Sequence, residues 1–223
     1  MSTRVRKAEI RKMLLRRDFG RLKNWSQSVR NPRRVLFSLS YDPDELIRCR
    51  AIEAIGHVCS WQARSDMERV RDYVRRLLWL MNDESGGLGW SSPEVLGEVL
   101  VNAPALIEEY GLLLTSFLRE EPFQAGTHQA VYRVATVDVR PFAGSEAELS
   151  RSLQDDDPVV RGYAALTLGL LGEGGAAEAI AGLRSDEAEV RRYDFHNGDL
   201  HTTTVGRMAL EAMELLQEAG CPA

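Results

Sequence analysis

The chain has 223 residues, of which 44% are apolar and 27% are charged, and its formal net charge is -5. This length and apolar content suffice for one continuous core, so a second domain is not required. No apolar run of about 18 residues occurs, and no apolar segment follows the basic N-terminus. These absences argue against a membrane span and a secretory signal, and a cytoplasmic protein is the expectation.

The N-terminal region carries a charge opposite to that of the remainder. Residues 1–34 contain twelve Lys and Arg but only Glu9 and Asp18 as acids, so they carry +10 while the rest carries -15. Apolar residues recur between these bases at helical spacing, which predicts an amphipathic helix or helix pair over residues 1–30. It could cap a helical stack, dock on an acidic protein, or contact nucleic acid or an anionic membrane. We favour the cap, with residues 31–223 forming the stack.

One phrase occurs twice, 113 residues apart: DELIRCRAIEAIG begins at Asp44, and DPVVRGYAALTLG begins at Asp157. Each Asp is a good helix N-cap, because its carboxylate can accept from the free amides of the first turn. Apolar residues at three- and four-residue spacing then give each helix one packing stripe. Gly56 and Gly169 remove a side chain at a tight contact or at the helix end. A repeated helix of this kind indicates stacked helical repeats.

The remaining chain divides into helix pairs on this assumption. We expect residues 32–39 to pair with 44–60, 66–80 with 93–102, 105–119 with 126–137, and 146–153 with 157–171. A fifth pair begins at residues 176–183, and its second helix, 204–219, is delayed by Asn197-Gly198. Asn-Gly between residues of alternating character is a strong hairpin signal. The predicted fold class is therefore all-α, an α-solenoid of about five helix pairs with a small β-hairpin near Asn197-Gly198.

The two phrases share an Asp-x-x-x-Arg-x-x-Ala-x-x-x-Leu/Ile-Gly skeleton. They resemble HEAT repeats of the short kind found in the phycobilisome-lyase HEAT-like group. The resemblance covers about half of the chain well. It implies a right-handed solenoid whose second helices line a concave face, with Arg48 and Arg161 pairing with acids of adjacent repeats. Residues 48–56 and 75–90 also resemble a subset of bacterial HEAT-like proteins, which carries no activity over to this chain.

The sequence lacks the common motifs of catalytic and phosphate-binding sites. It contains no Gly-x-Ser-x-Gly elbow, no His-Glu-x-x-His and no phosphate-binding loop. Cys49 and Cys59 lie ten residues apart on one predicted helix, too far for a disulfide. We therefore predict no catalytic residue, no metal and no cofactor.

Helical geometry proposes a concave surface. On the helix that begins after Asp44, residues at i, i+3 and i+7 form a second stripe that would face the groove. Later helices would add Glu94 and Glu98, then Gln129 and Arg133 or the alternative face of His128 and Tyr132, and then Tyr163. The predicted partner-binding groove consists of Arg50, Glu53, His57, Glu94, Glu98 and Arg133.

A glycine-rich loop bracketed by Trp79 and Trp90 joins the helices of the second pair. It is either a tight turn whose tryptophans pack on neighbouring repeats or a recognition loop at the mouth of the groove. Its acidic residues argue against a phosphate and favour a divalent cation or a basic peptide. The predicted rim residues are Asp83, Glu84, Ser85 and Trp90.

These features favour a non-catalytic protein-interaction or scaffold module that binds a protein or peptide in its groove. One alternative is a lyase-like or small-ligand-binding HEAT protein for a bilin or another tetrapyrrole. Another is a DNA-binding HEAT-like protein that uses the basic N-terminus. Nucleic acid is the weaker expectation, because the bases gather at one end of the chain and the predicted concave helices are mixed or acidic.

Overall fold

The structure is a computed structural model that describes residues 3–82 and 89–220, with side chains from residue 7 onward. The described chain is mostly helical and contains one two-stranded antiparallel sheet. This confirms the prediction of a helical protein with a small β-hairpin. None of its described helices is long and apolar enough to cross a membrane.

The N-terminal half consists of helices that follow the predicted boundaries closely. They are α1 (Thr3–Leu15), α2 (Phe19–Ser28), α3 (Pro32–Phe37), α4 (Glu45–Ala63), α5 (Met67–Asn82) and α6 (Ser92–Asn102). Short 3-10 and α segments follow in η1 (Pro104–Leu106), α7 (Ile107–Tyr110) and η2 (Leu112–Phe117).

The C-terminal half adds the remaining helices and the hairpin. It contains α8 (Gln124–Ala135), η3 (Arg140–Phe142), α9 (Glu146–Ser152), α10 (Pro158–Leu171), η4 (Gly174–Ala176), α11 (Ala177–Gly182) and η5 (Leu183–Ser185). The strands β1 (Glu189–Asp194) and β2 (Asp199–Thr204) precede the last helix, α12 (Val205–Glu218).

The repeated phrase folds in the same way at both of its positions. Asp44 accepts from the amides of Leu46 and Ile47, and Asp157 accepts from the amide of Val159, so both are N-caps. In each copy the Arg four residues later turns back onto the carbonyls that precede the helix. Arg161 also pairs with Asp186 at 2.7 Å, beyond α11, whereas Arg48 lies 3.9 Å from Glu45 in its own helix.

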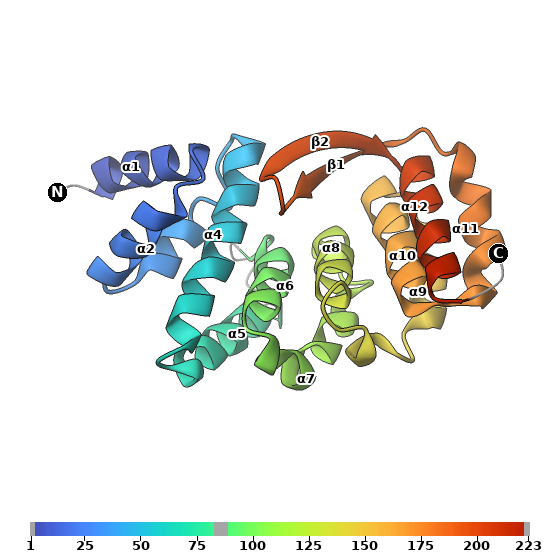
Figure 1. The fold of residues 1–223 in the computed structure, drawn as a ribbon, viewed down its shortest axis with the longest axis horizontal. Helices are drawn as coiled ribbons and strands as arrows, with labels where there is room; N and C mark the ends of the chain where they lie inside the picture. Colours follow the sequence, from blue (N-terminus) through green and yellow to red (C-terminus); the bar gives the residue numbers. More distant parts are fainter. Residues whose placement is uncertain (1–2, 83–88, 221–223) are drawn as a thin grey trace.

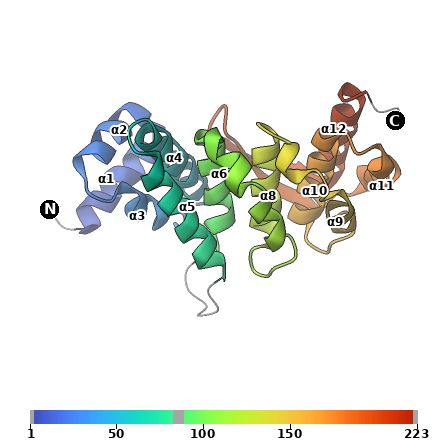
Figure 2. The same cartoon turned by 90° about the horizontal axis from the view of Figure 1, so that it is seen from below.

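The second helices of the expected pairs form a row. α4 packs on α6, α6 on α8, α8 on α10 and α10 on α12, while α3, α5, α9 and α11 pack behind members of the row. Figures 1 and 2 show the row running along the longest axis from the N-terminal to the C-terminal end. The buried apolar side chains of the row and its backing helices form one core.

The hairpin projects from the C-terminal end of the row and crosses back over it. In Figure 1 it leaves α12, passes over the ends of α10, α8 and α6, and reaches α4. Glu189 pairs with Thr204 and Asp194 with Asp199, so residues 195–198 form the turn. The turn is four residues long rather than two, with Gly198 at φ +77° and the Asp194 carboxylate accepting from the amides of His196 and Asn197.

The basic N-terminal region is a helix pair, α1 and α2, that packs against α4 at one end of the row (Figure 1). Ile10, Leu14 and Leu22 are buried at this contact. Part of the positive charge meets acids of the body, since Arg11 pairs with Asp42 at 2.9 Å.

The segment at residues 105–119 differs from the single helix that the sequence predicts. It is divided into η1, α7 and η2, and Leu112 and Leu113 are exposed. Pro104 begins the first short segment, and the five apolar residues at 105–107 and 112–113 do not fall on one stripe. A continuous α-helix would therefore place a larger apolar area in water.

Gly169 illustrates the close approach of helices in the row. A Cβ at this position would lie 2.7 Å from the backbone carbonyl oxygen of Ala212 on α12. We predict that Gly169→Ala lowers the free energy of unfolding by about 1–3 kcal/mol, because a helix backbone must move. Gly182→Ala is the matched control, since nothing lies within 4 Å of its added Cβ. Urea denaturation of both variants checks this; equal stabilities would contradict it.

Candidate functional site

Arg50 of α4 fixes the tip of the hairpin. Its side chain donates from Nε and Nη2 to the carbonyl oxygen of Gly198 at 3.0 and 2.8 Å. Its Nη1 donates to the carbonyls of Leu14 and Leu15 at the C-terminal end of α1, at 3.2 and 2.6 Å. Arg50 is only 8% exposed, so these carbonyls take the place of water around a buried guanidinium.

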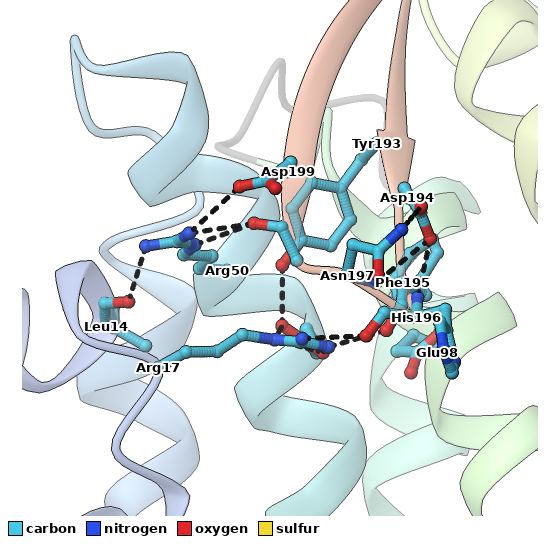
Figure 3. Close-up of polar contacts among 12 residues, drawn as sticks. Leu14, Arg17, Arg50, Glu98, Tyr193, Asp194, Phe195, His196, Asn197 and Asp199 are labelled. Atoms are coloured by element: carbon cyan, nitrogen blue, oxygen red, sulfur yellow. Dashed lines mark hydrogen bonds and ion pairs between the residues drawn. The ribbon is translucent and has the colours of Figure 1, made fainter.

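Glu53, one turn further along α4, holds the hairpin from the other side. It accepts from Tyr193 Oη at 2.6 Å and forms an ion pair with Arg17, which lies just beyond the end of α1. Arg17 in turn donates to the carbonyls of Phe195 and His196 at 2.6 and 2.9 Å. Arg17 and Arg50 thus bind three carbonyls of the turn (Figure 3). Together with Glu53, which binds Arg17 and Tyr193, they form the tip anchor.

A second buried carboxylate supports the turn from α6. Glu98 is 2% exposed, accepts from Arg133 Nε of α8 at 2.9 Å and from Asn102 Nδ2 at 2.7 Å. The guanidinium of Arg133 lies over the ring of Phe195, 4.3 Å from its centroid. Burial raises the pKa of Glu98 to about 7, because the desolvation of its carboxylate outweighs the nearby charge of Arg133.

The predicted groove residues therefore fall into two groups. Arg50, Glu53 and Glu98 are buried and contact other parts of this chain, with Arg50 and Glu53 bound directly to the hairpin. Glu94 and Arg133 line a pocket, and Arg133 is already paired with Glu98. Their role in binding a partner stays a prediction, but Arg50, Glu53, Glu98 and Arg133 already have partners within this chain.

His57 lies apart from both groups. It lies inside α4, which continues to Ala63. Gly56 before it is a packing glycine, since its added Cβ would lie 2.5 Å from Asn102 Nδ2. The imidazole of His57 packs against Phe19 and Trp61 with ring centroids 4.3 and 5.9 Å away. Burial among these rings lowers the pKa of His57.

A pocket of about 920 Å³ lies between the hairpin and the helix row. One wall is the hairpin, with Arg191 to His196 of β1 and the turn and with Leu200 and His201 of β2. The opposite surface comes from residues 40–43, Trp90 and Ser91, α4, α6, α8 and Tyr163 of α10. Its aromatic lining residues are Tyr41, Trp90, Tyr132, Tyr163, Tyr193 and Phe195. This volume is within the range of ligand-binding pockets, roughly 300–1,000 Å³.

Four arginines line the pocket, and each already has a partner. Arg48 donates to the carbonyl of Asp42 at 3.1 Å, and Arg133 pairs with Glu98. Arg191 pairs with Glu45 at 3.2 Å, while Arg192 pairs with Glu211 and donates to Tyr132 Oη at 3.0 Å. The positive charge of the lining is therefore largely neutralised inside the protein.

Glu94 is the exception among the pocket carboxylates of residues 3–82 and 89–220. Its Oε2 is buried and has no hydrogen-bond partner, and no cation pairs with it. Gly126 of α8 leaves room for the group, since a Cβ there would lie 2.6 Å from its Cδ and Oε2. Burial raises the pKa of Glu94 to about 7. The pocket thus holds an uncompensated acid.

Trp90 lines the same pocket as Glu94 and is 65% exposed. Tyr41 lies near the same carboxylate, and its Oη is 3.5 Å from the amide nitrogen of Ser91. The other predicted rim residues, Asp83, Glu84 and Ser85, lie outside the described residues. Within the described chain, no group of three or more His, Cys, Asp and Glu could hold a metal ion.

Sequence reasoning missed several residues that build this site. Arg17, Tyr193, Phe195 and Arg192 all contact helices from positions far away in the chain. The alternation around Asn197-Gly198 signalled the hairpin, but no local signal showed where its tip would dock. Helical periodicity also could not predict the positive φ of Arg17, +51°.

Comparisons with known proteins found similar proteins but indicate no activity. No family model matches the chain. An uncharacterised protein of Archaeoglobus fulgidus is 26% identical over 184 residues, a match that covers 80% of this chain and 94% of the archaeal protein. An engineered protein, whose crystal structure is a Northeast Structural Genomics Consortium target, has a TM-score of 0.54 at 17% identity. That match covers 84% of this chain and 80% of the engineered one, and it concerns the fold alone.

We predict that Arg50→Ala releases the hairpin, because the carbonyls of Gly198, Leu14 and Leu15 lose their shared donor. The cost should be about 3 kcal/mol, as for other buried charged hydrogen-bond donors. Hydrogen exchange of the amides in β1 and β2 should accelerate by more than that of the α8 amides. Arg151→Ala is the control, because Arg151 pairs only with Glu148 on an exposed surface. Unchanged exchange in the hairpin would contradict the anchor.

The unpaired Glu94 predicts a particular pH dependence of stability. Its pKa is about 7 in the fold and near the ordinary 4.5 in the unfolded chain, so folding favours the protonated form. The contribution of Glu94 therefore falls as pH rises from about 4.5 to 7. Glu94→Gln should raise the free energy of unfolding by about 2 kcal/mol at pH 8 and little at pH 4.5. Denaturation at both pH values checks this, with exposed Glu178→Gln as control; a destabilised Glu94→Gln at pH 8 would contradict it.

Proposed function

We propose that this chain is a non-catalytic interaction module that binds an extended segment of a partner protein in the pocket between the hairpin and the helix row. The observation that carries the proposal is this pocket, which has residues of the hairpin on one side and residues of the helix row on the other. Its volume and its six aromatic residues suit a segment of a few residues with its side chains enclosed.

The pairing of the hairpin supports an extended ligand. The amide of Val205 donates to the carbonyl of Ala188 at 3.0 Å, in line with the strand register. Hydrogen-bonded and non-bonded pairs alternate in an antiparallel ladder, so the peptide groups of Arg191 and Tyr193 point away from β2. Both residues line the pocket. A segment in strand conformation could add to this edge, as peptides do in β-augmentation.

The chain's own hairpin is a precedent for such a ligand. Its turn is held by carbonyl contacts to Arg17 and Arg50 and by the ring of Phe195 against Arg133. Arg17, Arg50 of α4 and Arg133 of α8 thus already hold another part of the chain, the hairpin turn, through its backbone carbonyls and one aromatic side chain.

Charge favours a protein segment over nucleic acid. The pocket arginines are engaged by Glu45, Glu98, Glu211 and backbone carbonyls, so little free positive charge remains for phosphates. The N-terminal bases lie on α1 and α2, at the end of the row rather than in the pocket (Figure 1).

We further propose that the helix row is a right-handed HEAT-like solenoid and that the protein works in the cytoplasm. The two copies of the Asp-x-x-x-Arg phrase support the first proposal, because both fold into the same capped helix start with the Arg on the preceding carbonyls. Cys49 and Cys59 are free thiols, which supports a reducing compartment.

A matched pair of tryptophans tests the binding site. Trp90 lines the pocket and Trp79 does not, yet they are 65% and 61% exposed. We expect a random array of 12-residue peptides to yield binders whose affinity falls roughly tenfold or more with Trp90→Ala, a loss typical of an aromatic hot spot. Trp79→Ala should leave the same affinities within about twofold. Isothermal titration calorimetry gives both values.

Four results would overturn the proposal. An array without binders would remove the peptide ligand, and equal losses for both tryptophan variants would remove the pocket as its site. Visible absorption after incubation with a bilin, lost in Trp90→Ala, would favour the tetrapyrrole alternative. Salt-sensitive binding of duplex DNA that is lost on removing residues 1–23 would favour the nucleic-acid alternative.

A further inference from the structure

We propose that the pocket selects a basic side chain, Lys or Arg, and places its cationic group against Glu94 beside Trp90 and Tyr41. This inference rests on the proposed function and names the residue that the bound segment must present. The cationic nitrogen would supply the charge that Glu94 lacks within the described chain.

The charge inventory of the pocket singles out this position. Asp42 is paired with Arg11, Glu45 with Arg191, and Asp194 accepts from amides in the hairpin turn. Only Glu94 has neither an ion pair nor a hydrogen bond from another residue among those that the structure describes. A carboxylate of this kind is costly unless a ligand neutralises it.

Glu98, one turn away on the same helix, has the cationic partner that Glu94 lacks within the described chain. Glu98 lies four residues after Glu94, forms an ion pair with Arg133 and accepts a hydrogen bond from Asn102. The pocket lining includes Glu94 but not Glu98. The helix row therefore supplies a cation, Arg133, to Glu98. Among the residues that the structure describes, it leaves Glu94, which lines the pocket, without one.

The aromatic neighbours fit the rest of a basic side chain. Trp90 offers a largely exposed ring at the pocket surface, and Tyr41 lies close enough for the charge of Glu94 to act on its hydroxyl. The aliphatic stem of Lys or Arg packs well on such rings, and a cation over a ring gains about 0.5–2 kcal/mol. A bare divalent ion would use neither ring and would need more oxygen ligands than the described residues provide here.

The test uses two peptide libraries that differ at one atom of the central residue. Each is a random 12-residue library with a fixed centre, which is Arg in one and citrulline in the other. Citrulline keeps the shape of Arg but is neutral. We expect the Arg library to bind the wild-type protein roughly tenfold more tightly, as for a charge-assisted, ring-packed contact.

Two variants assign this preference to one carboxylate. Glu94→Gln should reduce the preference for Arg over citrulline to less than about twofold while leaving the citrulline library nearly unchanged. Glu45→Gln is the matched control, because it removes the same charge from the pocket lining at a carboxylate already paired with Arg191. It should retain most of the preference. Circular dichroism of both variants confirms that the fold is intact.

Each outcome separates this inference from the proposed function. Binding that depends on Trp90 but not on the charge of the central residue would overturn the basic-residue assignment and leave the peptide site standing. Equal loss of the preference in Glu45→Gln would assign it to the overall field of the pocket rather than to Glu94. Competition by N-acetyl-arginine amide at the same concentration as the peptide would mean that a free cationic small molecule is the ligand. No binding by either library would overturn both proposals.

Discussion

The ion pair between Arg17 and Glu53, together with the burial of Arg50 beside it, is the constraint on which the rest of the molecule depends. The guanidinium of Arg50 and the carboxylate of Glu53 are buried where α4 meets the hairpin, and the partly exposed Arg17 pairs with Glu53. Such groups are tolerated only when their hydrogen bonds are complete, and here the carbonyls of the turn and the hydroxyl of Tyr193 complete them. The helix row and the hairpin must therefore fold as one unit.

This constraint converts an open row of helices into a pocket with two unlike walls. One wall consists of helix residues, and the other consists of residues of a two-stranded antiparallel hairpin. Because residues 189–204 begin at α11 and end at α12 yet dock on α4, the two ends of the row are held at a set separation (Figure 1). The size of the pocket is thus determined by the length of the hairpin as much as by the curvature of the row.

The sequence predicts the elements well and their long-range contacts poorly, for a physical reason. Helix starts at Asp44 and Asp157 depend on hydrogen bonds within a few residues, and so does the turn at Gly198. The docking of Gly198 on Arg50 joins residues 148 positions apart, and no local pattern encodes it. Spacing correctly put Arg50 and Glu53 on one stripe of α4, but their partner is the chain itself. Gly56 shows the same limit, because whether a glycine ends a helix or admits a neighbour depends on what packs there.

Glu94 and Glu98 lie on one helix stripe but differ in whether another residue of the described chain pairs with them. The two carboxylates lie one turn apart on α6, and burial raises the pKa of both to about 7. Arg133 and Asn102 offset part of the desolvation penalty of Glu98 by hydrogen bonding to it. Arg133 also lies over the ring of Phe195 in the turn. No residue of the described chain offsets the desolvation penalty of Glu94, although Gly126 leaves the space that its carboxyl group fills. A glutamine or a leucine at that position would destabilise the fold less. The proposed cationic ligand explains the glutamate, because its charge would compensate the buried carboxylate and so remove an existing destabilisation.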